Sequence, residues 1–304
     1  MAQSNEKPDG FLYQTVVRFN AIYVLESLGP GELKTGQDLF DSVIYPAASQ
    51  LDSLHTAFVA VTTKPDLLQQ LTLIEHAARV ANHHPVIHIE AHGSPDGIAL
   101  ADGTQVAWSE LIAAFTDINV ACKNNLIVIA ISCYGWNLTA SLMPSDRAPV
   151  FMLVGPPEPM TAGALLDATR RFYKALMSLF DVNQALEAMN VGLTFSQWPI
   201  RPATAEILYC RVFRRYIEEL GSGDALKDRE NRLVADIARS QSLNVVQSAS
   251  LRLEVRRDLA DHRTAYDRYR AKFLMLDLFP KDAQRFGLTY DLCMPTEAIL
   301  PIAV

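Results

Sequence analysis

Two short segments carry side chains that could do nucleophilic chemistry, namely His92-Gly93 and Cys133-Tyr134-Gly135. Each follows an apolar run, at 86–89 and at 126–131, with the composition of a buried strand. Parallel α/β sheets place their chemistry at the carboxyl ends of the strands, so both side chains are expected at one sheet edge. A thiol beside an imidazole there predicts a cysteine nucleophile, Cys133, with His92 as its base.

The backbone around these two residues could also contribute. The oxyanion formed on an attacked carbonyl needs donors, and we expect the N–H groups of Gly93 and Cys133 to supply them. A Cβ at residue 93 would crowd the approaching carbonyl, which accounts for a glycine there. The segment that begins at Gly135 directly after Cys133 can start a helix. The N-terminus of such a helix would stabilise the nearby thiolate. Ser132 or a backbone carbonyl is the candidate for orienting His92, since no acidic residue stands out.

The segments around these residues predict alternating strands and helices. The near-continuous apolar strands favour a mostly parallel sheet covered on both faces, an α/β fold. A hairpin is expected at 98–107 around Asp102-Gly103, and the chain beyond residue 202 is helical and charge-rich. The expected strands lie at 20–28, 56–62, 86–91, 126–132, 150–154 and 193–198, and the expected helices at 34–50, 65–81, 109–117, 162–179 and 181–190.

Composition restricts the class of protein. The 304 residues are 49% hydrophobic and 20% charged, as in a soluble globular protein with a sizeable core. The net charge of -7 does not favour nucleic acid, and no apolar run reaches the roughly 18 residues that a membrane helix needs. The N-terminus lacks the apolar core of a secretion signal. A cytoplasmic protein with free thiols and no cofactor is expected, since metal-finger spacing is absent among its cysteines, Cys122, Cys133, Cys210 and Cys293.

The motifs HIEAHGSPDGI (88–98) and LIVIAISCYG (126–135), separated by a tryptophan-led helix, resemble the paired His-Gly and Cys-Gly boxes of caspase-fold cysteine peptidases, clan CD. The separation of 41 positions from His92 to Cys133 is similar to the spacing in that family. The segment FYKALMSLFDVNQALEAMN (172–190) resembles the helix pair of the bacterial CHAT-like branch. The resemblance covers about residues 15–200 and implies a caspase-like peptidase domain at 1–200, followed by a helical region of unknown role at 201–304.

The resemblance implies that Cys133 is the nucleophile and His92 the general base and acid, with Gly93 and Cys133 forming the oxyanion hole. It also places the pocket for the residue before the cut near the ends of the first and fifth strands. Glu26 and Glu158 are the acidic candidates there, which would favour a basic residue, and Trp136 is close enough to the nucleophile to touch substrate.

The implied function is an endopeptidase that cleaves a protein partner, in a bacterial defence or regulated-death pathway by family analogy. Activation by a protein partner or by self-cleavage is expected, with movement of the hairpin 98–107 and the loop 155–161.

Two alternatives stay open from the sequence. A catalytically silent caspase-fold scaffold could bind partners through its C-terminal helices. A metal-dependent hydrolase could use His88, Glu90 and His92, which alternate along one strand and so share a face. The arginines between residues 252 and 270 alternate with aspartates, which favours a salt-bridged solvated surface over a nucleic-acid groove.

Overall fold

A computed structural model describes residues 17–51, 53–193, 200–221, 223–241 and 245–294. The chain divides into two compact units. The first, called the sheet unit here, comprises the residues up to Ser141 together with Ala148–Ala205. The second, the helical unit, comprises Leu142–Arg147 and the residues from Glu206 onward. The short segment before Ala148 therefore packs with helices that come much later in the chain.

The sheet unit is built on a mostly parallel sheet, as the apolar runs predict. Its main path runs in the order β2-β1-β3-β6-β7-β8, and only the pairing of β7 with β8 is antiparallel along it. The short strands β4 and β5 form an antiparallel hairpin attached to the end of β3, where a hairpin was expected. The strands are β1 (Ala21–Ser27), β2 (His55–Ala60), β3 (Pro85–Ser94), β4 (Gly97–Ala99), β5 (Gln105–Ala107), β6 (Ile127–Ile131), β7 (Met152–Gly155) and β8 (Arg201–Thr204).

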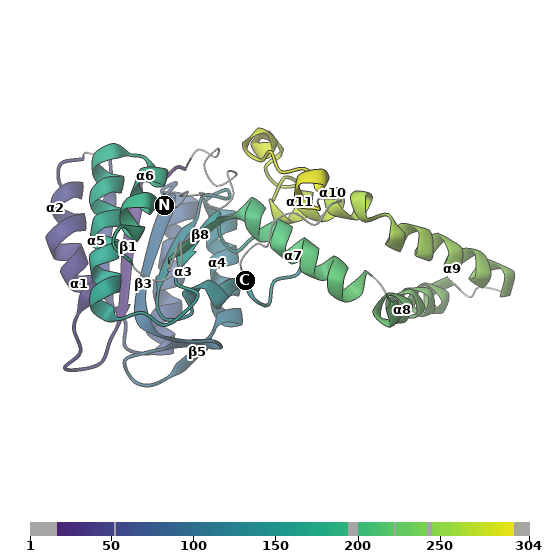
Figure 1. Cartoon of the computed structure of the whole chain (residues 1–304), viewed down its shortest axis with the longest axis horizontal. Helices are drawn as coiled ribbons and strands as arrows, with labels where there is room; N and C mark the ends of the chain where they lie inside the picture. The colour runs from purple at the N-terminus through teal and green to yellow at the C-terminus, as the bar shows by residue number, and fades with distance from the viewer. Residues whose placement is uncertain (1–16, 52, 194–199, 222, 242–244, 295–304) are drawn as a thin grey trace, which may run out of the picture. The chain divides into compact units, whose positions relative to one another are not determined.

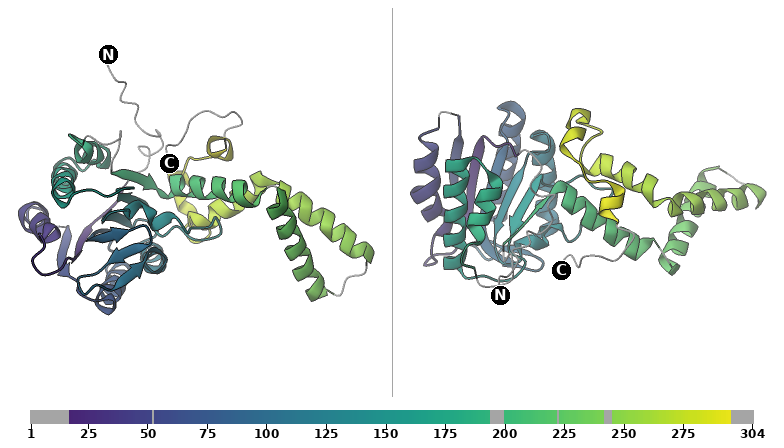
Figure 2. Two further views of the ribbon diagram at one scale, coloured as in Figure 1. Left: turned by 60° about the horizontal axis from the view of Figure 1, so that its bottom comes forward. Right: turned by 45° about the horizontal axis from the view of Figure 1, so that its top comes forward.

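Helices cover both faces of this sheet (Figure 1, Figure 2), which confirms the α/β fold class. One face carries α1 (Thr35–Leu39), the π-helical turn η2 (Phe40–Ile44), α2 (Tyr45–Ala48), α5 (Ala162–Leu179) and α6 (Val182–Asn190). The predicted helix at 34–50 corresponds to the continuous series α1, η2 and α2. The other face carries α3 (Lys64–Val80) and α4 (Trp108–Ala121).

Local sequence explains where these elements begin. All seven residues of β1 are buried, as expected for a central strand of a sheet covered on both faces. Helix α3 starts with a capping box in which Thr63 accepts from the N–H of Asp66, and the Asp66 side chain accepts from the N–H of Thr63. The buried residues of α3 recur at helical spacing and face the sheet: Leu67, Leu71, Ile74 and Ala78.

The helical unit has a core of aromatic rings. Tyr209 and Tyr266 are buried, with ring centroids 5.1 Å apart, and the Tyr209 hydroxyl donates to the Tyr266 carbonyl at 2.6 Å. Arg147, from the short segment, pairs with Asp277 through both guanidinium nitrogens. The helices are α7 (Ala205–Leu220), α8 (Gly223–Gln241), α9 (Val245–Ala260), α10 (His262–Phe273), the 3-10 turn η4 (Pro280–Arg285) and α11 (Tyr290–Cys293).

One sequence expectation is wrong here, and another falls outside the described residues. Free thiols were expected throughout, but Cys210 on α7 and Cys293 on α11 form a disulfide with their Cα atoms 5.4 Å apart. The two cysteines are 83 positions apart, so the sequence does not indicate that they meet. Their contact depends on how α7 and α11 pack. The strand expected at 193–198 lies outside the described residues beyond Leu193, and the final described strand is β8. None of the described helices combines the length and apolar character needed to cross a bilayer.

Candidate active site

The register of β3 on β6 brings His92 and Cys133 to one edge of the sheet. Each recorded pair, from Val86↔Ile127 to Glu90↔Ile131, joins residues 41 positions apart. His92 and Cys133 have this same separation and lie two residues beyond the last pair. Because side chains alternate along a strand, His92 shares the face of Glu90, while Cys133 lies in the turn beyond the end of β6. The strand pairing therefore brings both residues to the same edge of the sheet.

The backbones of Gly93 and Cys133 are in direct contact. A Cβ added at Gly93 would stand 1.9 Å from the carbonyl oxygen of Cys133 and 2.8 Å from its backbone nitrogen, so no other residue fits. The sequence explanation for this glycine was therefore incomplete, because the nearest obstacle to a side chain at residue 93 is the backbone of Cys133 rather than a substrate carbonyl. This close approach sets the two amides proposed as oxyanion donors beside each other.

A tight turn presents the thiol. The N–H of Gly135 donates to the carbonyl of Ser132 at 3.0 Å, which makes Cys133 and Tyr134 the central residues. Tyr134 has a left-handed backbone, with φ at 61°, a conformation that is strained for a bulky residue and recurs at functional sites. Gly135 cannot carry a side chain, since a Cβ there would be 2.3 Å from the carbonyl oxygen of Ala130.

The helix expected at Gly135 is only the five-residue 3-10 turn η3 (Gly135–Thr139). A long helix does begin near the thiol, but it comes from later in the chain. The Cys133 sulfur lies 4.0 Å from the carbonyl of Met160, and the next residue, Thr161, is the N-cap of α5. Cys133 is half-buried and forms no disulfide in the described part of the chain. Its sulfur is thus close to the start of an 18-residue helix.

His92 has an acidic partner that sequence reasoning missed. Its Nε2 lies 2.6 Å from Oε1 of Glu32, and the two side chains are 66% and 39% exposed. The hydrogen bond with His92, together with one from the N–H of Gly29, holds the pKa of Glu32 below its ordinary value. Ser132, the expected orienting group, does not contact His92, because its hydroxyl is buried with no partner among the described residues. The sequence could have pointed to Glu32 through its position, since Glu32 follows β1 and so lies at the same sheet edge as His92.

The predicted pocket residues lie in three different surroundings. Glu26 is 3% exposed, and one of its carboxylate oxygens accepts from the N–H groups of Gly36 and Gln37 at 2.8 and 3.1 Å. Its carboxylate therefore points into the protein, toward the start of α1. Glu158 is exposed on the loop after β7, two residues before Met160. Trp136 is half-buried in η3, and its backbone N–H donates to the carbonyl of Pro156 at 3.2 Å.

The residues of the metal alternative are not gathered around a common point. His88 is fully buried, and its Nε2 lies 3.3 Å from Oε1 of Glu90, while Thr35 donates to the other oxygen at 2.8 Å. Nearby, burial and the Glu90 charge raise the pKa of Tyr173 well above its ordinary value. His92 is exposed and turned to Glu32 instead. Within the described ranges, no three His, Cys, Asp or Glu side chains are arranged to hold a metal ion.

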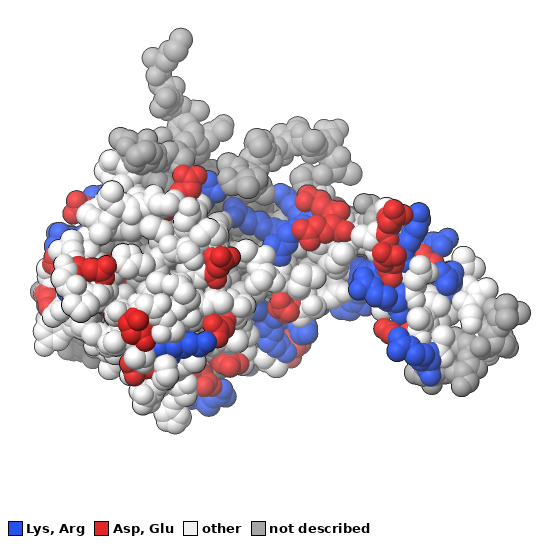
Figure 3. Space-filling view, turned by 90° about the horizontal axis from the view of Figure 1, so that it is seen from below, with Lys and Arg blue, Asp and Glu red and all other residues white. Residues whose placement is uncertain are grey.

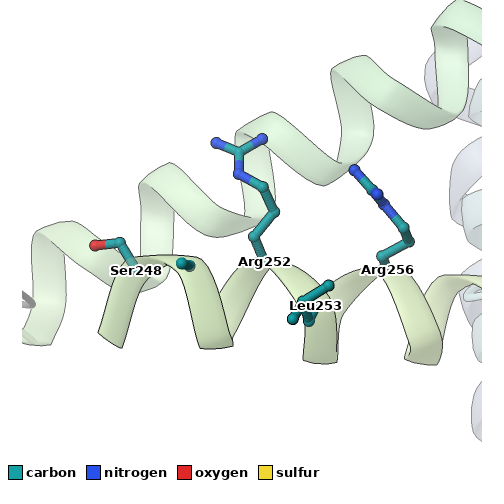
Figure 4. A pocket seen from close by; sticks show the side chains of 5 residues that line it. Ser248, Arg252, Leu253 and Arg256 are labelled. Carbon is teal, nitrogen blue, oxygen red and sulfur yellow. The ribbon is translucent and has the colours of Figure 1, made fainter. Parts of the chain in front are cut away.

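The helical unit has a separate surface depression of about 450 Å³ on α9, lined by Ser248, Ala249, Arg252, Leu253 and Arg256. Figure 4 shows Arg252 and Arg256 extending from α9 toward α8, where both contact Glu230. Blue and red groups lie side by side on these helices in Figure 3. The salt-bridged surface expected from the sequence is therefore present, although its main acidic partner lies on α8. Among the described residues, no His, Cys, Asp or Glu side chain lines this depression.

No protein-family model matches the chain, and no curated protein matches it either. What is established is an α/β protein with a mostly parallel sheet, and a thiol and an imidazole at the carboxyl edge of neighbouring strands.

Proposed function

We propose that this chain is a cysteine endopeptidase of caspase-like fold, of the CHAT-like branch, that cleaves a protein partner with Cys133 and His92. The observation that carries the proposal is the contact of Gly93 with Cys133. It joins the His-Gly segment at the end of β3 to the backbone of the turn that carries the thiol after β6. A half-buried cysteine in a strained turn, in backbone contact with the residue that follows a histidine, is an arrangement that nucleophilic catalysis can use.

The reaction would proceed through a covalent thioester. The Cys133 thiol gives its proton to His92, and the sulfur forms a bond to the carbonyl carbon of the scissile peptide. The N–H groups of Gly93 and Cys133 donate to the resulting oxyanion. When the C–N bond breaks, His92 passes the proton to the leaving amine. Water then attacks the thioester and gives a proton to His92, which returns it to the thiolate as the new carboxylic acid leaves.

The loop that follows β7 is the better candidate for substrate recognition. Glu158 is exposed on this loop, and Met160 of the same loop lies beside the Cys133 sulfur. Glu26, by contrast, is buried on the backbone amides of α1. A preference for Lys or Arg before the cut would therefore come from Glu158. The defence or regulated-death role, and activation by a partner or by self-cleavage, belong to this proposal by family analogy alone.

The test begins with the thiol itself. The intact protein is treated with iodoacetamide at neutral pH, and the modified cysteines are identified by mass spectrometry. We expect Cys133 to react at least about tenfold faster than a cysteine in an unfolded peptide, and His92→Ala to remove the difference. His76→Ala, which alters an exposed histidine on α3, is the matched control. Reaction at the ordinary rate would favour the silent scaffold.

Cleavage is then tested with fluorogenic peptides that vary in the residue before the cut, and with candidate partner proteins. Cys133→Ala must abolish cleavage, whereas Cys122→Ala, which alters a buried cysteine on another part of the sheet unit, must leave it unchanged. Cleavage that survives Cys133→Ala would overturn the assignment of the nucleophile.

A further inference from the structure

We propose that Glu32 is a positioning residue for His92, which sets the tautomer of the imidazole and stabilises its protonated form. This inference rests on the proposed function. Oε1 of Glu32 lies 2.6 Å from Nε2 of His92, a short distance typical of a hydrogen bond to a charged group. The two residues are 60 positions apart, so the contact is made by the fold and not by neighbouring residues in the chain.

Glu32 is itself held in place by the loop that follows β1. Its second carboxylate oxygen accepts from the N–H of Gly29, and its own N–H donates to the Gly29 carbonyl at 3.3 Å. Lys34 then ties the end of the loop to its beginning, because its ammonium donates to the carbonyls of Leu28 and Gly29, which directly follow β1. The carboxylate is therefore oriented by its backbone before any substrate arrives, as a positioning group must be.

The tautomer of His92 follows from the chemistry of its partner. An ionised carboxylate can only accept hydrogen bonds, and the lowered pKa of Glu32 keeps it ionised at neutral pH. Nε2 must then carry the ring proton, which leaves the lone pair on Nδ1. Nδ1 is thus the atom that can take the proton of the Cys133 thiol. Without Glu32, the neutral ring could place its proton on either nitrogen, and one of these tautomers cannot act as the base.

Among the described residues, the charged groups that act on Glu32 are His92 and Lys34. The ammonium of Lys34 is occupied by backbone carbonyls. The Cys133 thiol, in the turn after β6, is the group that the proposal has His92 deprotonate. Because the carboxylate is the anion in contact with the ring, it favours the imidazolium and so the thiolate–imidazolium pair. This effect matters most at a pH where a lone thiol stays protonated.

The experiment compares alkylation of Cys133 at pH 6 and pH 9 in the intact chain. For Glu32→Gln we expect the rate at pH 6 to fall about tenfold and the rate at pH 9 to change less than about twofold. A loss of structure would slow, or speed, both reactions alike. Glu110→Gln is the matched control, since Glu110 also accepts from a backbone N–H three residues earlier and pairs with a cation. Its side chain is 41% exposed, and it should leave both rates unchanged.

Nitrogen-15 NMR of labelled histidine gives a second measurement that needs no reactive thiol. In the native protein at neutral pH, Nδ1 of His92 should show the shift of an unprotonated nitrogen, and Glu32→Ala should give a mixture of both tautomers. If Cys133 is activated but Glu32→Gln leaves the pH 6 rate at its native value, the role of Glu32 is wrong and the proposed function stands. If Cys133 reacts like an ordinary thiol and His92 still shows a single tautomer, the proposed function fails while the positioning contact remains.

Discussion

Gly93 and Cys133 touch through their backbones, so closely that a Cβ on Gly93 would be 1.9 Å from the Cys133 carbonyl oxygen. This contact joins the two segments that carry the candidate catalytic groups. It needs the end of β3 and the turn after β6 to keep their positions relative to each other. The glycine therefore links the stability of the sheet edge to the geometry of the candidate site.

Replacing Gly93 with alanine should disturb both properties. The added methyl group forces the two backbones apart, which we expect to cost about 1–3 kcal/mol of unfolding free energy. Alkylation of Cys133 should also lose its dependence on His92. Urea unfolding and the iodoacetamide rate measure these effects. Gly163→Ala is the control, because nothing lies within 4 Å of a Cβ there and the residue is helical. A Gly93→Ala protein of native stability would contradict the contact.

Substitutions at Glu26 and Glu158 should have different effects, the first on the stability of the fold and the second on substrate preference. Glu26→Ala leaves two backbone N–H groups at the start of α1 without their acceptor, at a cost of about 1–3 kcal/mol. It should not change which residue is accepted before the cut. Glu158→Gln should instead preserve stability and lower kcat/KM for Lys and Arg substrates by about tenfold relative to apolar ones. Denaturation curves and a peptide panel distinguish the two, and the reverse pattern would restore Glu26 to the pocket.

The disulfide between Cys210 and Cys293 should stabilise the helical unit. It closes a long loop, with 83 residues between its ends, and thereby restricts the unfolded chain. Cys210→Ser should lower the unfolding free energy by about 2–4 kcal/mol when the protein is prepared under oxidising conditions. In the presence of dithiothreitol the unfolding free energy of the native protein should fall toward that of Cys210→Ser. Cys122→Ser, which alters a cysteine outside the disulfide, should keep the native stability and should lose as much of it to the reductant as the native protein does. Equal melting temperatures with and without reductant would show that the bond does not form.

The buried carboxyl of Glu206 should make the helical unit less stable as the pH rises. Burial raises the pKa of Glu206 above its ordinary value, although its Oε1 accepts from the N–H of Leu288 at 2.7 Å. The folded state therefore binds the proton more tightly than the unfolded state does. Stability is lost as the pH rises from the ordinary value of 4.5 through the raised value. Glu206→Gln lacks this loss, so its melting temperature relative to the native protein should increase between pH 4 and pH 7. A constant difference would count against the burial.

The sequence by itself determined most of the strands and helices of the sheet unit, with shifts at their ends, but it did not predict β8. Apolar runs such as 126–131 are readable because burial on both faces of a parallel sheet requires apolar side chains at consecutive positions. The positions of His92 and Cys133 followed for the same reason, since the carboxyl ends of parallel strands meet at one edge. These are local patterns combined with one general rule of topology.

The tertiary structure alone decided the partners. Glu32 and His92 are 60 residues apart, Cys210 and Cys293 are 83 apart, and nothing in their spacing signals a contact. The direction of Glu26 also had to come from the structure, because the position of a residue at a strand end does not tell whether α1 covers its carboxylate. Such pairings depend on where loops and helices pack, and packing results from the whole set of contacts rather than from any one segment.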